Sequence, residues 1–193
     1  MSKIYYKYTK LDKMNYFEDM LKHNRLYAAR FDQFNDYDEG HYFYSPQKYS
    51  QLDIEFIKNL KFEQRILCLT ENANNTLMWG HYSDGDRGIA MGVEVIDRDC
   101  EMKPVEYVQQ LISINDLKHL SREELVSKIL IQKGEEWSYE NEMRVFKFHG
   151  CYYVDVLVKK IILGQRVRNE DEIKEMIQKY NPSIKILKHN ETN

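Results

Sequence analysis

One stretch of the sequence decides the fold prediction: residues 133–148, which read KGEEWSYENEMRVFKF. From position 140 onward, charged and then aromatic residues occupy every second position, as side chains on one face of a β-strand do. Glu140, Glu142 and Arg144 would share that face and lead to phenylalanines at positions 146 and 148. We therefore expect residues 143–148 to form an interior strand whose polar beginning lines a cleft. The alternative is an arginine that pairs with a glutamate on a solvent-facing strand, and such exposed pairs add little stability.

A second stretch, residues 75–95, predicts a short helix, a turn and a strand. Asn75 or Thr76 can cap the helix, and two glycines frame the polar turn that follows it. Trp79 and Tyr82, or Met78 and Tyr82, then share a helix face. The strand alternates apolar residues with small ones, and small residues let another group approach the backbone closely. We expect both aromatic side chains at the mouth of the cavity that the glutamates line. The alternative is that another helix packs on this strand and that both aromatics belong to the core.

The composition indicates one domain that spans residues 1–193. The chain has 193 residues, and no Pro/Gly/Ser-rich linker or internal repeat divides it. Lys and Arg total 28 against 31 Asp and Glu, which gives a net charge of −3 and argues against broad nucleic-acid binding. The first residues lack the apolar segment of a secretion signal, and no run of about 18 apolar residues occurs. We therefore expect a cytoplasmic protein that does not enter membranes.

Neither the cysteines nor the histidines form a metal-binding pattern. The three cysteines are widely spaced and include no Cys-x-x-Cys pair, so we expect buried thiols rather than disulfides or a zinc site. No two of the six histidines are three or four positions apart, and Asp36-x-Asp38 lacks the remaining positions of a calcium loop. P-loop, Gly-x-Ser-x-Gly and Gly-x-Gly-x-x-Gly motifs do not occur. The sequence therefore predicts no metal.

The hydrophobic pattern predicts an α+β fold with a mainly antiparallel, mixed sheet and flanking helices. Strands and helices follow one another irregularly rather than in a repeated β-α order, which favours this class. Strands are expected at residues 4–9, 26–30, 65–70, 89–95, 105–108, 143–148, 152–158, 160–163 and 184–187. Helices are expected at residues 12–24, 52–60, around Trp79, over most of 113–132 and at 169–179. Within 113–132, a capping box begins at Ser121 and ends at Glu124.

Six short motifs occur in a characteristic order along the chain. They are Lys7-Tyr8, Leu26-Tyr27, Phe34-Asn35-Asp36, Met78-Trp79-x-His81-Tyr82 with Gly88, Lys133-x3-Trp137-x-Tyr139-Glu140-x-Glu142-x-Arg144, and Ile161-Ile162-Leu163-Gly164. This order resembles a bacterial and phage family of unknown function that is often met among abortive-infection and phage-defence genes. The resemblance covers nearly the whole chain and implies a defence-related protein that acts inside the cell. One departure is Tyr37, where the family commonly has proline, so the turn after Asn35-Asp36 is expected to differ.

We take the polar and aromatic residues of these motifs as candidates for ligand binding. They are Lys7, Tyr8, Asn35, Asp36, Trp79, His81, Tyr82, Trp137 and Arg144.

The paired glutamates also resemble the ADP-ribosyltransferase fold, in which a glutamate at the head of a late strand, often within Glu-x-Glu, grips the nicotinamide ribose of NAD. The resemblance implies NAD as a substrate and Glu142 as the carboxylate that stabilises an oxocarbenium-like transition state. Glu140 would then orient or deprotonate an acceptor whose identity the sequence does not give. Two features depart from that pattern. The first strand offers Lys7 and Tyr8 in place of an arginine or histidine, and Leu69-Thr70-Glu71 matches the middle-strand Ser/Thr motif only loosely.

Two other classes of function stay open at the level of sequence. In a binding module without chemistry, Trp79, Tyr82, Arg144 and Glu94 would hold a nucleotide-like ligand or a partner protein. In a metal-dependent nuclease, Asp36, Glu94 and Glu142 would hold the metal. No lysine follows two residues after a candidate acid on the strands concerned, which disfavours the nuclease.

Overall fold

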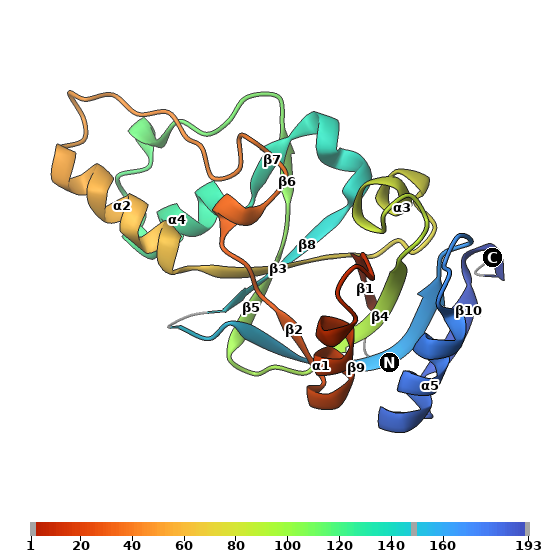
Figure 1. Ribbon diagram of the computed structural model, residues 1–193. Helices are drawn as coiled ribbons and strands as arrows, with labels where there is room; N and C mark the ends of the chain where they lie inside the picture. The colour runs from red at the N-terminus through yellow and green to blue at the C-terminus, as the bar shows by residue number, and fades with distance from the viewer. Residues whose placement is uncertain (1–2, 148–149, 192–193) are drawn as a thin grey trace.

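The computed structural model describes residues 3–147 and 150–191, and in them eight strands form one sheet (Figure 1). The strand order is β10-β9-β4-β1-β3-β8-β5, and β2 also pairs with β9. Only β10 and β9 run parallel; the other pairs within this sheet are antiparallel. A separate small sheet joins β6 and β7 in parallel. The α+β fold with a mainly antiparallel, mixed sheet is therefore confirmed.

The elements have the following bounds. The strands are β1 Tyr5–Thr9, β2 Arg25–Tyr27, β3 Arg65–Thr70, β4 Ile89–Val95, β5 Cys100–Pro104, β6 Glu106–Val108, β7 Gln132–Gly134, β8 Glu142–Lys147, β9 Tyr153–Leu163 and β10 Lys185–Lys188. The α-helices are α1 Met14–His23, α2 Gln51–Glu63, α3 Thr76–Tyr82, α4 Arg122–Leu130 and α5 Glu170–Tyr180. The 3-10 helices are η1 Phe31–Gln33, η2 Ile114–Asp116, η3 Glu135–Glu140 and η4 His189–Glu191. None of the described helices is long and apolar enough to cross a membrane.

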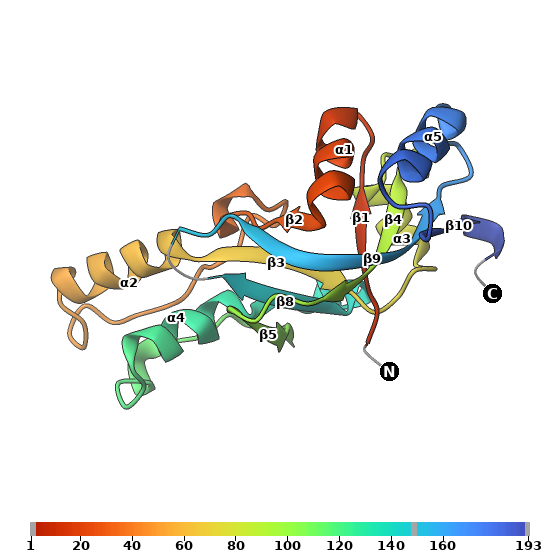
Figure 2. The same cartoon turned by 90° about the horizontal axis from the view of Figure 1, so that it is seen from below.

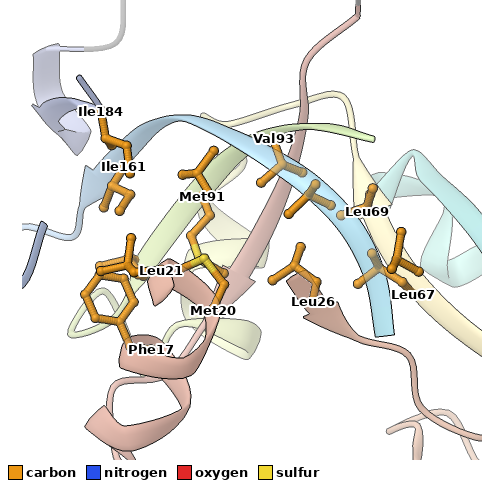
Figure 3. Packing of buried hydrophobic residues seen from close by; sticks show 14 of the residues in the cluster. Phe17, Met20, Leu21, Leu26, Leu67, Leu69, Met91, Val93, Ile161 and Ile184 are labelled. Atoms are coloured by element: carbon orange, nitrogen blue, oxygen red, sulfur yellow. The ribbon is translucent and has the colours of Figure 1, made fainter. Parts of the chain in front are cut away.

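Helices α1 and α5 lie next to each other on one side of the sheet (Figure 2). The apolar residues of α1 occur at helical spacing, which places Phe17, Met20 and Leu21 on one buried face. Figure 3 shows these side chains against Met91 of β4 and Ile161 of β9. The main core therefore lies between this helix pair and the middle of the sheet.

Helices α2 and α4 form a second layer at the other end of the molecule (Figures 1 and 2). Both helices begin with a capping box, at Ser50 and Ser121, which supplies partners to backbone N–H groups that a helix start leaves free. Ile57 of α2 and Leu130 of α4 belong to a second apolar core, together with Phe146 of β8. Strand β8 thus has this second core on the face that carries Phe146.

Strand β8 lies inside the sheet, between β3 and β5. The expectation of an interior strand here is confirmed for residues up to Lys147, whereas Phe148 lies outside the described residues. Glu142, at the start of β8, is directly opposite Thr70 of β3, and Thr70 is opposite Tyr6 of β1. Three strands that are far apart in the sequence therefore meet in one row, and the functional candidates lie around it.

The expectation that Glu140 belongs to the same strand is wrong. Glu140 ends the 3-10 helix η3, and the next residue, Asn141, adopts a left-handed conformation with φ of 43°. A residue in this conformation turns the chain and cannot continue a strand, and asparagine tolerates it better than most residues. Glu140 therefore reaches the site from the turn before β8 rather than from the face of the strand.

Three further boundaries differ from the sequence-based expectations. Residues 113–132 are not one helix, because only Arg122–Leu130 is α-helical and a short 3-10 turn precedes it. The two strands expected at 152–158 and 160–163 are one strand, Tyr153–Leu163, with a shift in register where it passes Gly92 and Val93 of β4. Strands β5 and β7 were not expected at all.

Candidate functional site

A cavity of about 170 Å³ lies where β1 and β3 separate. Among the described residues these two strands pair at one position, Tyr6 opposite Thr70. The side chain of Lys7 reaches across from β1, and its Nζ donates to the carbonyl oxygen of Cys68 on β3 at 3.2 Å. Aromatic and sulfur-containing residues on the wall are Tyr6, Tyr8, Phe34, Cys68, Met78 and Tyr82. Polar and charged wall residues are Lys7, Gln33, Asn35, Lys133, Glu140, Glu142 and Arg144.

Arg144 is the centre of a buried ion-pair network on this wall. Its guanidinium is fully buried and donates to Glu142 Oε1 from Nε at 2.8 Å. On its other side it donates to both carboxylate oxygens of Glu39, at 2.6 and 2.7 Å, and also to the carbonyl oxygen of Leu130. Two carboxylates thus share one guanidinium in a forked geometry, which fixes the positions of all three side chains.

Glu39 reaches Arg144 because the chain turns sharply after it. Gly40 has φ of +70°, and a Cβ atom there would lie 2.9 Å from the ring of Phe31. A glycine is therefore required by both conformation and space. The turn holds Glu39 only 5% exposed, at a point 105 residues away from its partner in the sequence.

Lys133 connects the two glutamates of the Glu-x-Glu motif. Its Nζ donates to Glu140 Oε2 at 2.6 Å and lies 3.6 Å from Glu142 Oε2. The ammonium group also lies 4.4 Å from the centre of the Trp137 ring. The hydroxyl of Tyr82 donates to the other oxygen of Glu140. Glu140 and Glu142 therefore share the cation although they come from different elements.

Local hydrogen bonds position α3 and the start of β8. The side chain of Asn75 accepts from the N–H groups of the first turn of α3 and donates to the carbonyl oxygen of Tyr139. This bond ties α3, which carries Tyr82, to the residue before Glu140. The backbone N–H of Glu142 donates to the hydroxyl of Tyr107 at 2.8 Å. Glu142 is thus held through its backbone N–H as well as through its carboxylate, and Glu140 is held through the backbone of the preceding residue as well as through its carboxylate.

The two glutamates of the motif have different acidities. Burial alone would raise the pKa of Glu142, but the positive charges of Arg144 and Lys133 outweigh it and bring the pKa to about 2. Burial raises the pKa of Glu140, and neither Lys133 nor the hydroxyl of Tyr82 reverses this shift. Glu142 is therefore a permanent carboxylate, while Glu140 binds a proton more readily than Glu142 does.

Seven of the eleven candidates from the sequence line this one cavity. They are Lys7, Tyr8, Asn35, Tyr82, Glu140, Glu142 and Arg144. Tyr82 therefore shares the cavity of Glu142, as expected. Trp79 is one layer behind the wall: it is 1% exposed, its Nε1 donates to the carbonyl oxygen of Ala73 at 2.9 Å, and its ring meets Tyr8 edge-on at 5.1 Å.

The other three candidates also lie outside the wall. His81 is exposed on α3, and its ring lies near those of Tyr82 and Tyr139. Trp137 is half-buried beside Lys133. The carboxylate of Asp36 accepts from the backbone N–H of Asp38 at 2.9 Å, which closes a local turn.

The proposed nuclease triad is not assembled at this cavity. Asp36 and Glu94 are not on its wall, and the carboxylate of Glu94 pairs with Lys159 at 3.2 Å. In the part of the chain that the structure describes, no three His, Cys, Asp or Glu side chains group closely enough to hold a metal ion.

Sequence reasoning missed Glu39, Lys133 and Cys68 as parts of the site. Lys133 is the first residue of the motif that contains Glu140, Glu142 and Arg144, so its membership of that motif could have identified it as a site residue. Cys68 lies opposite Arg144 in the sheet, and burial raises the pKa of its thiol well above the ordinary value. Glu39 follows Asp36 and Asp38 in a polar segment, and an acid directly before a glycine was its only local signal.

Comparisons with protein-family models, with curated proteins and with solved structures found no match to this chain. The resemblance to a phage-defence family therefore stays a prediction.

Proposed function

We propose that this cavity receives the nicotinamide end of NAD and that the protein breaks the N-glycosidic bond, as an ADP-ribosyltransferase or NAD glycohydrolase does. The observation that supports this proposal most is the position of Glu142. Its ionised carboxylate lies on a cavity wall at the head of an interior strand, beside the opening between β1 and β3. A fixed negative charge in that position is what an oxocarbenium-like transition state requires.

The charges around Glu142 favour this role even though Arg144 is bound to it. Glu39 takes the other side of the Arg144 guanidinium, and Glu140 takes the Lys133 ammonium. Three carboxylates face two cations, and because burial raises the pKa of Glu39 and of Glu140, the cluster reaches its full net charge of −1 only when both of these are ionised. That charge lies beside the cavity, where burial limits screening by water.

In the proposed reaction, the bond between C1′ of the ribose and the pyridinium nitrogen breaks, and both bonding electrons go to the nitrogen. Nicotinamide leaves as a neutral molecule, and Glu142 stabilises the positive charge that develops on the ribose. Water or an acceptor then attacks C1′ and gives its proton to Glu140. With water, the products are ADP-ribose, nicotinamide and one proton.

The size of the cavity limits how much of the ligand it encloses. About 170 Å³ is less than the roughly 300–1,000 Å³ of pockets that enclose a drug-sized ligand. We propose that only the nicotinamide and its ribose enter and that the phosphates stay near the opening. Lys7 is suited to meet a phosphate there, because its ammonium lies on the wall and, among the described residues, is bound to a carbonyl oxygen but to no carboxylate.

The test is to incubate the purified protein with NAD and to follow nicotinamide release by chromatography. No acceptor is needed if water can attack. Glu142→Gln keeps the shape of the side chain and removes its charge, so release should slow by about 100- to 1,000-fold while the fold is kept. Glu135→Gln is the matched control, because Glu135 is an exposed glutamate on η3 and is not on the cavity wall. Release at similar rates by the wild type and by Glu135→Gln, with much slower release by Glu142→Gln, would support the proposal.

A second candidate is a binding module without chemistry, in which the charge network only shapes the pocket. One observation favours it: the Arg144 guanidinium donates to both carboxylates and to the Leu130 carbonyl. A thermal-shift screen with dinucleotides separates the two candidates, since a ligand that binds only the folded state raises its apparent stability. Stabilisation by NAD without nicotinamide release would favour the binding module. A role in phage defence would be tested by comparing phage plaque formation on cells that express the wild type or Glu142→Gln.

A further inference from the structure

Within the described part of the chain, Lys133 is the one residue that pairs with both carboxylates of the Glu-x-Glu motif. It lies on β7, and its side chain is 6% exposed. Its ammonium donates to Glu140 at 2.6 Å and lies 3.6 Å from Glu142. The face of the Trp137 ring lies 4.4 Å away and favours a positive charge at this point.

The two carboxylates depend on Lys133 to different degrees. Glu142 has a second cation, because Arg144 donates to both of its oxygens. Among the described residues, Lys133 is the only cation paired with Glu140, whose other oxygen accepts from the neutral hydroxyl of Tyr82. Removal of the Lys133 charge would therefore affect Glu140 more than Glu142.

The groups that face Glu140 come from every element packed around it. They are Lys133 of β7, Tyr82 of α3, Tyr139 of η3 and Glu142 of β8, with Tyr107 of β6 and Arg144 of β8 behind Glu142. The tyrosines are neutral, and burial raises the pKa of Tyr82 and of Tyr107 further. Glu142 is a permanent negative charge nearby, and it opposes a second negative charge on Glu140.

We propose that Lys133 is a positioning residue that keeps Glu140 ionised beside Glu142, so that Glu140 can accept the proton of the attacking water or acceptor near neutral pH. This inference rests on the proposed function for the identity of that proton. Two neighbouring buried carboxylates cannot both stay ionised without a cation between them. The direction of the Glu140 shift agrees, because burial raises its pKa and Lys133 is the largest influence that lowers it.

The test compares Lys133→Met, which removes the charge, with Lys133→Arg, which keeps it. The full-length protein would be labelled with ¹³C in the glutamate carboxyl groups and titrated by NMR, and Glu140→Gln identifies the Glu140 signal by its loss. Loss of an opposite charge within hydrogen-bond distance should raise the pKa of Glu140 by about 1–3 units. In Lys133→Arg the titration of Glu140 should stay close to that of the wild type.

The same variants provide a kinetic readout that loss of stability alone would not produce. The acidic limb of the pH profile for NAD cleavage should move to higher pH in Lys133→Met and return in Lys133→Arg. An unchanged Glu140 titration in folded Lys133→Met would overturn the inference. If the wild type releases no nicotinamide, the proposed function fails, and the NMR titration still decides whether Lys133 controls Glu140.

If Lys133→Met does not fold, the same contact can be tested by changing Glu140 and measuring the pKa of Lys133. The two glutamates raise the pKa of Lys133 against the effect of burial. In Glu140→Gln, the titration of the Lys133 side chain, followed by ¹³C at Cε, should therefore move to lower pH. An unchanged Lys133 titration would show that the two groups do not control each other, and it would overturn the inference as well.

Discussion

Arg144→Met is the change that probes the buried network most severely, because methionine keeps much of the side-chain volume and removes the charge. The guanidinium of Arg144 is 0% exposed, and its removal leaves Glu39 and Glu142 facing each other without their shared cation. Breaking a buried ion pair by removing one partner costs about 3–5 kcal/mol. In a domain of this size each kcal/mol corresponds to about 2–4 °C, so the melting temperature should fall by about 6–20 °C.

Circular dichroism during heating and urea unfolding would both measure this loss. Lys48→Met is the matched control, because Lys48 pairs with Asp116 at 3.0 Å and both side chains are exposed. Exposed pairs contribute about 0–1 kcal/mol. A second substitution, Glu39→Gln, should recover part of the stability of Arg144→Met by removing one unpaired buried carboxylate. Equal melting temperatures for Arg144→Met and the wild type would refute the reasoning and would mean that Arg144 is solvated or held by other groups.

Three further predictions concern neighbouring groups. Glu140→Gln should reduce transfer to an acceptor more than NAD hydrolysis, because Glu140 would orient the acceptor as well as take its proton, whereas water only has to give up a proton; equal losses in both assays would contradict this division of roles. Glu142 has a pKa of about 2 in the folded protein against 4.5 ordinarily, and a depressed pKa adds stability above the unfolded value that is lost as pH falls through the folded one. As pH falls from 4.5 to about 2, the free energy of unfolding measured with urea should therefore decrease more steeply for the wild type than for Glu142→Gln. Parallel decreases in the two proteins would argue against a depressed pKa of Glu142. Trp79→Phe should lower the free energy of unfolding by about 1–3 kcal/mol, since it leaves the buried Ala73 carbonyl without its donor, and should leave any NAD affinity nearly unchanged; a large loss of affinity in a stable variant would place Trp79 in the ligand site.

Local patterns in the sequence were enough to predict several elements. The run from Arg65 to Thr70 was expected as a strand and has those bounds. Asn75 or Thr76 was expected to cap the Trp79 helix, and Asn75 does so by accepting from two backbone N–H groups. The capping box at Ser121 is present as expected. In each case the signal lies within a few residues of the structure that it specifies.

The structure differs from the sequence-based expectations where a partner distant in the sequence, or the backbone conformation of a single residue, determines the local structure. Strand β5 has the sequence Cys-Glu-Met-Lys-Pro, with no strong apolar run, and exists as an edge strand because β8 offers it a partner. Two strands were expected at 152–158 and 160–163, but the chain absorbs one extra residue opposite β4 and continues as one strand. The alternation that placed Glu140 on a strand is interrupted by the left-handed Asn141.

The candidate site was predictable in its chemistry but not in its connections. The Glu-x-Glu-x-Arg motif led to Glu142 and Arg144, and the structure places both on the cavity wall. The second carboxylate on Arg144 comes from Glu39, 105 residues away in the sequence. Such a partner is fixed by the fold of the segment before Gly40, and no local pattern specifies it.

The central claim is that the ionised carboxylate of Glu142 stabilises positive charge on the ribose of NAD. The most direct measurement is the single-turnover rate of nicotinamide release at saturating NAD, for the wild type and for Glu142→Gln, with NAD binding measured separately by calorimetry. We predict that the rate falls about 100- to 1,000-fold in Glu142→Gln, the usual effect of one electrostatic catalytic group, while NAD affinity changes little. Equal rates in the two proteins, or no NAD binding by the wild type at millimolar concentration, would contradict the account.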